Sequence, residues 1–216
     1  MSTLFKATQY DGLSVGQAYG GGFFAGYISH TEDGIPTHAL IVAPRLTGAT
    51  GLAYSLTTNL AYKTANTTTA GTASLFDGAA NTAAMVTAGI NDHPAAKFCT
   101  ELTIGGFTDW YLPAIRELDI AYFNLKRSTG ENNAGSTFGI NTYSVPVRSK
   151  NYSKNFPVQT RIAAFKTTAE RFELSHWSST ENSNSNAWVI NMTAANVNAD
   201  NKTSTFCVRA FRRIAL

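Results

Sequence analysis

Residues 105–118 limit the possible folds of this chain more than any other stretch, because they predict a turn, a strand and a helix in succession. Two adjacent glycines begin the stretch and permit the turn, and an aromatic and apolar run follows at 110–112. Pro113 ends that run, since proline cannot donate to a strand ladder, and its fixed φ suits the first turn of a helix. Apolar residues then recur at steps of three and four, at Ile115, Leu118, Ala121, Tyr122 and Leu125. This spacing predicts one apolar helix face that extends to about Lys126.

An earlier helix is predicted over residues 94–102, with Asp92 as its cap and Pro94 at its first position. Apolar or alternating runs predict strands at 23–28, 39–43, 161–165, 175–178, 187–192 and 206–214. The first two strands flank a polar turn at 31–34, which is typical of an antiparallel hairpin. The chain therefore predicts an α+β fold with two helices, antiparallel strands and long loops.

The long loops are expected at 47–73 and 127–160, where Thr, Asn, Ser and Gly are abundant. Within the first of them, Leu52, Tyr54 and Leu56 alternate as in a short strand. Long ordered loops in compact domains are often functional.

Four motifs carry a resemblance to a known family. They are Trp-Tyr-Leu-Pro-x3-Glu-Leu at 110–118, Trp-Ser-Ser-Thr-Glu at 177–181, Ala-Trp at 187–188 and Val-Arg-Ala-x-Arg-Arg at 208–213. Together they resemble the Lcl C-terminal domain family, also called domain of unknown function 1566. That family is a branch of the C-type-lectin-like fold, and this chain looks especially like the version found in bacteriophage tail and fibre proteins.

The resemblance implies a C-type-lectin-like domain over residues 20–216, preceded by an arm or attachment segment at 1–19. It also implies that the first helix packs on the final strand, which would make Cys99 and Cys207 near neighbours. Two cysteines are too few for a disulfide framework, and we expect both to be buried and reduced.

The motif residues are interpreted as structural, because each tryptophan is embedded in an apolar run. The predicted core motif comprises Trp110, Leu112, Pro113, Glu117, Trp177, Glu181, Trp188, Arg209 and Arg213. We expect the three tryptophans to be mostly buried and in mutual contact with Leu112, Leu118 and Val208. Arg209 and Arg213 share a strand face with Phe211, and we expect Glu117, Glu181 or Asp109 to pair with them. Glu181 is expected to accept hydrogen bonds from the backbone or an arginine.

Composition excludes several classes of function. Charged residues make up only 14% of the chain and the net charge is +3, without a basic stripe interleaved with aromatic residues. We therefore expect no nucleic-acid partner. No apolar run is long enough to span a membrane, and no signal peptide is evident, so synthesis in a host cytoplasm without membrane insertion is expected.

No catalytic constellation or cofactor site is predicted. The four histidines lack metal-ligand spacing, although His30 and His38 could face each other across the hairpin. Ser179 lacks a nucleophile elbow, and the calcium motifs by which C-type lectins bind sugars are missing. Formylglycine-generating enzymes share the broad fold, so an enzyme of that kind is a rival interpretation. Their chemistry uses a cysteine pair at a metal site, whereas both cysteines here fall on core elements.

An asparagine-rich segment near the C-terminus is the predicted binding site. Its candidate ligand-binding residues are Asn182, Asn184, Asn186, Asn196, Asn198, Asn201 and Lys202. Asparagine offers both a donor and an acceptor without charge, as in the adaptable polar part of an antibody paratope. An ordinary solvated loop is the alternative interpretation.

These features predict a non-enzymatic virion protein, a tail or fibre module that binds a glycan or protein on the host surface. The alternative is a structural or decoration protein of the virion. The expected partners are other virion proteins, the host receptor and, by analogy with phage fibre tips, two further copies in a homotrimer.

Overall fold

The computed structural model describes residues 12–51, 59–134, 139–166 and 169–216. Its helices are α1 (Arg45–Gly48), α2 (Gly78–Gly89), α3 (Pro94–Thr100), α4 (Ile115–Leu125) and α5 (Ala163–Lys166), with a 3-10 turn η1 (Ile90–Asp92). Its longer strands are β2 (Gly22–Ile28), β3 (His38–Val42), β6 (Ser175–Glu181), β7 (Asn186–Asn191), β8 (Asn196–Asn201) and β10 (Phe211–Ala215). Two-residue strands are β1 (Ala18–Tyr19), β4 (Leu60–Ala61), β5 (Ser144–Val145) and β9 (Thr205–Phe206). Helices and antiparallel sheets together confirm the predicted α+β class.

The larger sheet has the order β1-β2-β3-β10, with β5 also paired to β2, and every pairing is antiparallel. The predicted hairpin is confirmed as β2 and β3. Helix α4 packs on β2, and Gly26 makes that approach possible. A Cβ at Gly26 would lie 2.6 Å from Nδ2 of Asn124 on α4, and its φ of +139° disfavours other residues.

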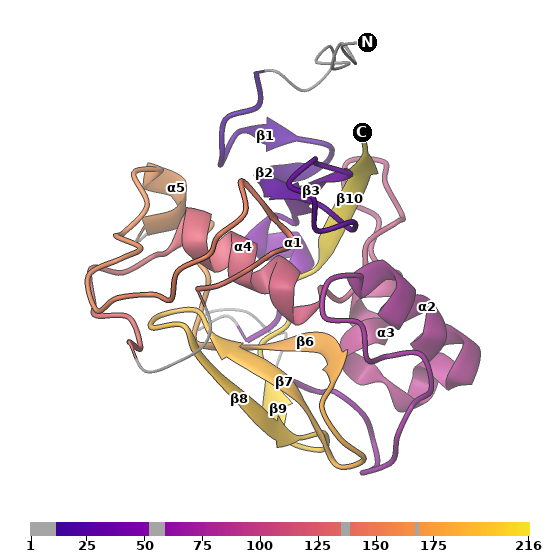
Figure 1. Ribbon diagram of the computed structural model, residues 1–216. Helices are drawn as coiled ribbons and strands as arrows, with labels where there is room; N and C mark the ends of the chain where they lie inside the picture. The colour runs from indigo at the N-terminus through magenta and orange to yellow at the C-terminus, as the bar shows by residue number, and fades with distance from the viewer. Residues whose placement is uncertain (1–11, 52–58, 135–138, 167–168) are drawn as a thin grey trace, which may run out of the picture.

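A second sheet has the order β6-β7-β8, and α4 lies between it and the larger sheet (Figure 1). No strand was predicted between those at 187–192 and 206–214, but residues 196–201 form β8. Each residue of β8 pairs with one on β7, from Asn191 with Asn196 to Asn186 with Asn201. Val197 and Ala199 alternate with asparagines, and this alternation suits an edge strand with one packed face. The predicted strand over Leu52, Tyr54 and Leu56 lies outside the described residues, as do residues 1–11 of the predicted arm.

Two predicted helices are present as α3 and α4, but the expected number was wrong because α2 adds twelve residues. The side chain of Asp77 caps α2 by accepting from the Ala80 N–H at 2.8 Å. The predicted cap of α3 was also wrong, because His93 and not Asp92 holds that position. The strand predicted at 161–165 is instead the short helix α5.

The core consists of two hydrophobic clusters. Trp110, Leu112, Trp177 and Val208 lie together in one, as predicted. Leu118 lies in the other, and Trp188 only packs against that second cluster from a partly buried position. A single cluster containing all three tryptophans was therefore a wrong prediction, because β7 directs Trp188 to the opposite face of the sheet from Val189. Among the described helices, none is long and apolar enough to cross a membrane.

Candidate functional site

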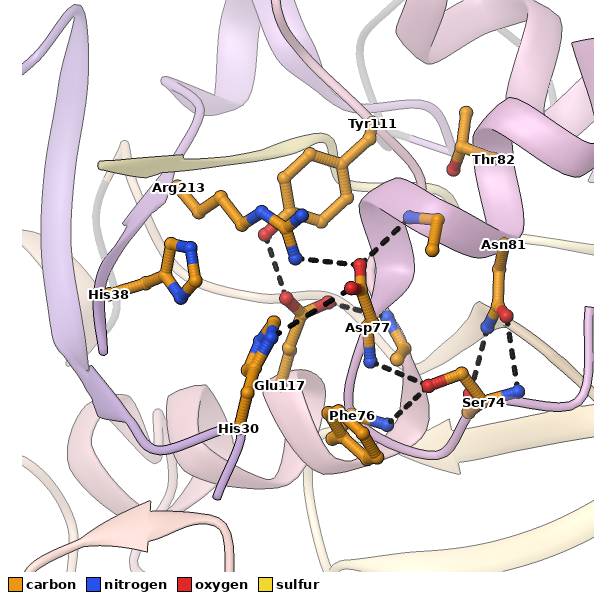
Figure 2. Close-up of polar contacts among 12 residues, drawn as sticks. His30, His38, Ser74, Phe76, Asp77, Asn81, Thr82, Tyr111, Glu117 and Arg213 are labelled. Atoms are coloured by element: carbon orange, nitrogen blue, oxygen red, sulfur yellow. Dashed lines mark hydrogen bonds and ion pairs between the residues drawn. The ribbon is translucent and has the colours of Figure 1, made fainter. Parts of the chain in front are cut away.

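The Trp-Tyr-Leu-Pro-x3-Glu motif is built around Glu117, which is fully buried on α4. Glu117 accepts hydrogen bonds from the Tyr111 hydroxyl at 2.7 Å and from the Ala114 N–H at 2.7 Å (Figure 2). The second bond satisfies a backbone donor at the start of the helix. Burial raises the pKa of Glu117 to about 8, and the same burial raises the pKa of Tyr111 well above its usual value.

Asp77 joins three elements beside this carboxyl group. Besides capping α2, it pairs with Arg213 of β10 at 2.6 Å and lies 3.8 Å from Nδ1 of His30 (Figure 2). The rings of His30 and His38 are 4.5 Å apart, so the predicted cross-hairpin pair is present. Burial, with help from the neighbouring His30 and Arg213, lowers the pKa of His38 to about 4.

This network has perturbed pKa values, which active sites often show. Neither the cavity beside Phe123 nor the one beside Arg127 is lined by residues of this network, however. Glu117 and Asp77 instead connect the larger sheet with α2 and α4 through satisfied hydrogen bonds. We therefore interpret the network as structural.

The arginine partners differ from those predicted. Arg209 is buried and donates to Glu170 at 2.8 Å and to the carbonyl oxygen of Ala43 at 2.6 Å. Arg213 pairs with Asp77, and only Arg212 pairs with an expected carboxylate, Asp109. Arg209 lies before β10, which begins at Phe211, and tertiary packing selected the partners of both arginines.

A pair of buried lysines lies beneath the turn between β6 and β7. Lys202 donates to the carbonyl oxygens of Thr67 (3.0 Å) and Asn184 (2.9 Å), and its ammonium lies 2.9 Å from Glu181. Lys63 donates to the same Thr67 carbonyl at 3.1 Å. The prediction that Lys202 binds ligand was wrong, because its side chain is completely buried and its donors are used internally.

Glu181 has the structural role predicted for it. Both of its carboxylate oxygens accept from the Thr69 N–H at 3.1 Å. The cation beside it is Lys202 rather than an arginine. The ammonium group thus occupies a cage of carbonyl and carboxylate oxygens of the type that could otherwise bind a metal ion.

The predicted asparagines gather at the sheet formed by β7 and β8. Asn182, Asn184, Asn196 and Asn198 are exposed, whereas Asn186 and Asn201 are partly buried. Some of their amide groups are already used. The Asn184 side chain accepts from Thr68, that of Asn201 accepts from Thr203, and that of Asn196 accepts from Asn133. Asn182 and Asn198 are thus the two exposed members whose side chains form no hydrogen bond with another described residue.

The structure also reveals a cavity that sequence reasoning missed, of about 440 Å³, beside the outer face of α4. It is lined by Phe123, Gly139, Arg148, Ser149, Lys150, Asn151, Tyr152, Ser153 and Phe156. One signal was available: Phe123 is an aromatic residue outside the periodic apolar face of its helix. The remaining lining comes from the loop at 139–156, where no periodicity marks a site.

The cysteines are both buried free thiols. Burial raises the pKa of Cys99 far above its usual value and that of Cys207 to about 11, so neither is activated as a nucleophile. Within the described ranges, no three or more His, Cys, Asp or Glu side chains are arranged to hold a metal ion.

The Lcl C-terminal domain family matches residues 49–212, which is most of the chain. The chain belongs to this family. The curated proteins contain no match to it. One similar solved structure is a fimbrial protein from Bacteroides ovatus ATCC 8483, with 16% identity and a TM-score of 0.37. That similarity covers 85% of this chain and 36% of the other, so the chain spans about a third of the fimbrial protein's length.

Proposed function

We propose that this member of the Lcl C-terminal domain family is a non-enzymatic binding module with a C-type-lectin-like fold. It acts in a bacteriophage particle, as the tail or fibre part that recognises a glycan or protein on the host surface. It is made in the host cytoplasm and works in the virion beside other virion proteins. By analogy with other phage fibre tips, it forms a homotrimer there.

The observation that carries this proposal is the exposed polar edge formed by β8. In the described part of the chain, β8 pairs with β7 alone, so its other edge remains available. Asn196 and Asn198 lie exposed on that strand, beside the partly buried Val197. Uncharged amides on a rigid strand can exchange hydrogen bonds with sugar hydroxyls or with a protein backbone.

The buried charges support binding rather than catalysis. Glu117, Asp77 and Glu181 are each used in helix capping or in an ion pair, and both thiols have raised pKa values. The hydrogen bonds and ion pairs of these carboxylates therefore stabilise the fold. This favours a binding module over an enzyme related to the formylglycine-generating group.

The test is the double substitution Asn196→Ala and Asn198→Ala. Because both side chains are exposed, the free energy of unfolding should change by no more than about 0.5 kcal/mol. Adsorption of the protein or particle to host cells should weaken, since each lost polar contact in an interface is worth about 1 kcal/mol. Asn91→Ala, at an exposed asparagine on η1, is the matched control. Unchanged adsorption with an intact fold would count against the receptor-binding function.

A structural or decoration role is the second candidate, and the same edge favours it. An unpaired strand edge can accept a strand from a neighbouring chain. In that case the double substitution would impair particle assembly and leave adsorption of assembled particles unchanged. A reconstruction of the particle would show whether β8 is free at the distal surface or covered by another virion chain.

A further inference from the structure

Phe156 is the only exposed aromatic residue in the described ranges, with 53% of its surface accessible. It forms one wall of the 440 Å³ cavity beside α4. An exposed aromatic ring in the wall of a cavity offers a flat apolar surface on which a ligand can stack, and aromatic side chains commonly line small-molecule sites.

Phe156 stands on a tight turn with a rigid backbone. The N–H of Ser153 donates to the carbonyl oxygen of Phe156 at 3.0 Å, and the N–H of Phe156 donates back at 3.2 Å. Beneath the turn, the buried amide of Asn132 donates to the carbonyl oxygens of Ser153 (3.0 Å) and Pro157 (3.0 Å). Buried Lys126 also donates to Pro157 at 3.2 Å. Two buried polar side chains therefore hold the turn that presents this ring, which pre-organises it for a ligand.

The floor of the cavity is equally constrained. Phe123 meets Phe156 edge-on, with ring centroids 5.5 Å apart and an angle of 76°, so the two rings form an aromatic corner. The Arg148 guanidinium lies 4.5 Å from the Phe123 ring and pairs with buried Asp119, which also accepts from the Tyr152 hydroxyl at 2.6 Å. Arg148 is thus neutralised within the protein and acts as a fixed part of the floor.

The rim of the cavity is polar and carries no carboxylate. Ser149, Lys150, Asn151 and Ser153 are all exposed there, and together they offer hydroxyl, amide and ammonium groups. The cavity therefore combines an apolar aromatic corner with a ring of hydrogen-bonding groups. A pyranose ring has the complementary form, with an apolar face of C–H groups and hydroxyls around its edge.

We infer that this cavity binds a single hexopyranose ring, stacked on Phe156 and hydrogen-bonded by the rim. The volume lies within the range of about 300–1,000 Å³ that small-ligand sites occupy. The inference rests on the proposed recognition of a host glycan and deepens it, because it assigns the sugar ring to the Phe156 cavity and leaves the β8 edge for neighbouring contacts.

The experiment is saturation-transfer NMR and calorimetry on the full chain, with methyl β-D-galactopyranoside, methyl β-D-glucopyranoside and methyl N-acetyl-β-D-glucosaminide as probes. At least one should bind, with transfer strongest to ring C–H protons. Phe156→Ala should weaken binding at least tenfold, whereas Phe156→Trp should retain it. Val158→Ala is the matched control, since Val158 is an exposed apolar residue two positions away and outside the cavity lining.

Failure of all three probes with the unmodified protein would overturn the inference, as would binding that Phe156→Ala leaves unchanged in a folded protein. Melting curves show whether each variant folds. If Phe156→Ala does not fold, sugar binding is measured instead on Phe156→Ser and on the rim variant Asn151→Ala. Host adsorption is measured in parallel. Adsorption that depends on Asn196 and Asn198 without sugar binding would remove the cavity assignment and leave the proposed function standing.

Discussion

Two surface turns of this protein are each held by a buried lysine, and the two lysines differ in their counter-charge. Lys202 holds the turn of Asn184 through backbone carbonyls and also pairs with Glu181. Lys126 holds the turn of Phe156 through the carbonyl oxygens of Gly130 (2.6 Å) and Pro157 (3.2 Å). No ion pair among the described residues includes Lys126.

The counter-charge sets how strongly each turn depends on its lysine. A buried ion pair is costly to break, because removing one partner leaves the other charge unpaired in the protein. A lysine that contacts only carbonyl groups leaves no charge behind when it is replaced. The Asn184 turn therefore depends on its lysine more strongly than the Phe156 turn does, although the two lysines are buried to a similar degree.

The largest expected effect follows replacement of Lys202. Lys202→Met should lower the free energy of unfolding by about 3 kcal/mol, because the Glu181 carboxylate then loses its ion pair and keeps the hydrogen bond from the Thr69 N–H. Urea denaturation measures this loss. The double variant Lys202→Met with Glu181→Leu should recover part of it, and a single variant as stable as the parent would contradict the ion-pair account.

A smaller effect is expected for the lysine without a counter-charge. Lys126→Met should cost about 1 kcal/mol, the net value of a hydrogen bond, because Pro157 keeps its bond from Asn132 and water can reach exposed Gly130. The same denaturation experiment measures it beside Lys202→Met. Equal losses in the free energy of unfolding of the two variants would contradict the proposed difference between the turns.

The two lysines should also differ at alkaline pH. Burial lowers the pKa of Lys126 below its usual value, whereas for Lys202 the nearby Glu181 partly offsets the same lowering. Between the folded and unfolded pKa values of a lysine the unfolded chain holds more protons, so the free energy of unfolding rises with pH in that window. The free energy of unfolding rises between the lowered pKa of the lysine in the folded protein and about 10.5, its pKa in the unfolded chain. Below the folded pKa there is no such rise.

The measurement compares the parent with Lys126→Met at about pH 7 and about pH 10. The parent should gain stability relative to the variant as the pH increases, because the variant has no ammonium to lose. A pH dependence identical in both proteins would show that Lys126 does not titrate differently in the folded state.

The smallest expected effect is that of a chelator. Because the ammonium of Lys202 fills the oxygen cage at Glu181, removal of divalent cations should leave the melting temperature unchanged. Thermal melts with and without EDTA test this. A lower melting temperature in EDTA would reveal a cation site, and Glu181 and Asp109 would be the first carboxylates to substitute.

Much of the fold was predictable from the sequence because its signals are local. The apolar period after Pro113 predicted α4, the turn at 31–34 predicted the hairpin, and the Trp-Tyr-Leu-Pro motif indicated the family. Helix α2 was missed because Asp77 and the following small residues carry little apolar periodicity. Glycine and alanine at most of its positions do not define a buried face.

The apolar spacing in the sequence was enough to predict the buried face of α4, because a repeat of three and four residues permits one orientation of the helix. Only the tertiary structure decided the polar partners. Lys202 is buried because carbonyl oxygens from Thr67 and Asn184 converge on it, and Arg209 pairs with Glu170 across a distant loop. Both sets of contacts join donors and acceptors that are far apart in the sequence. A lysine or arginine in a sequence looks the same whether solvent or a closed ring of oxygens surrounds it.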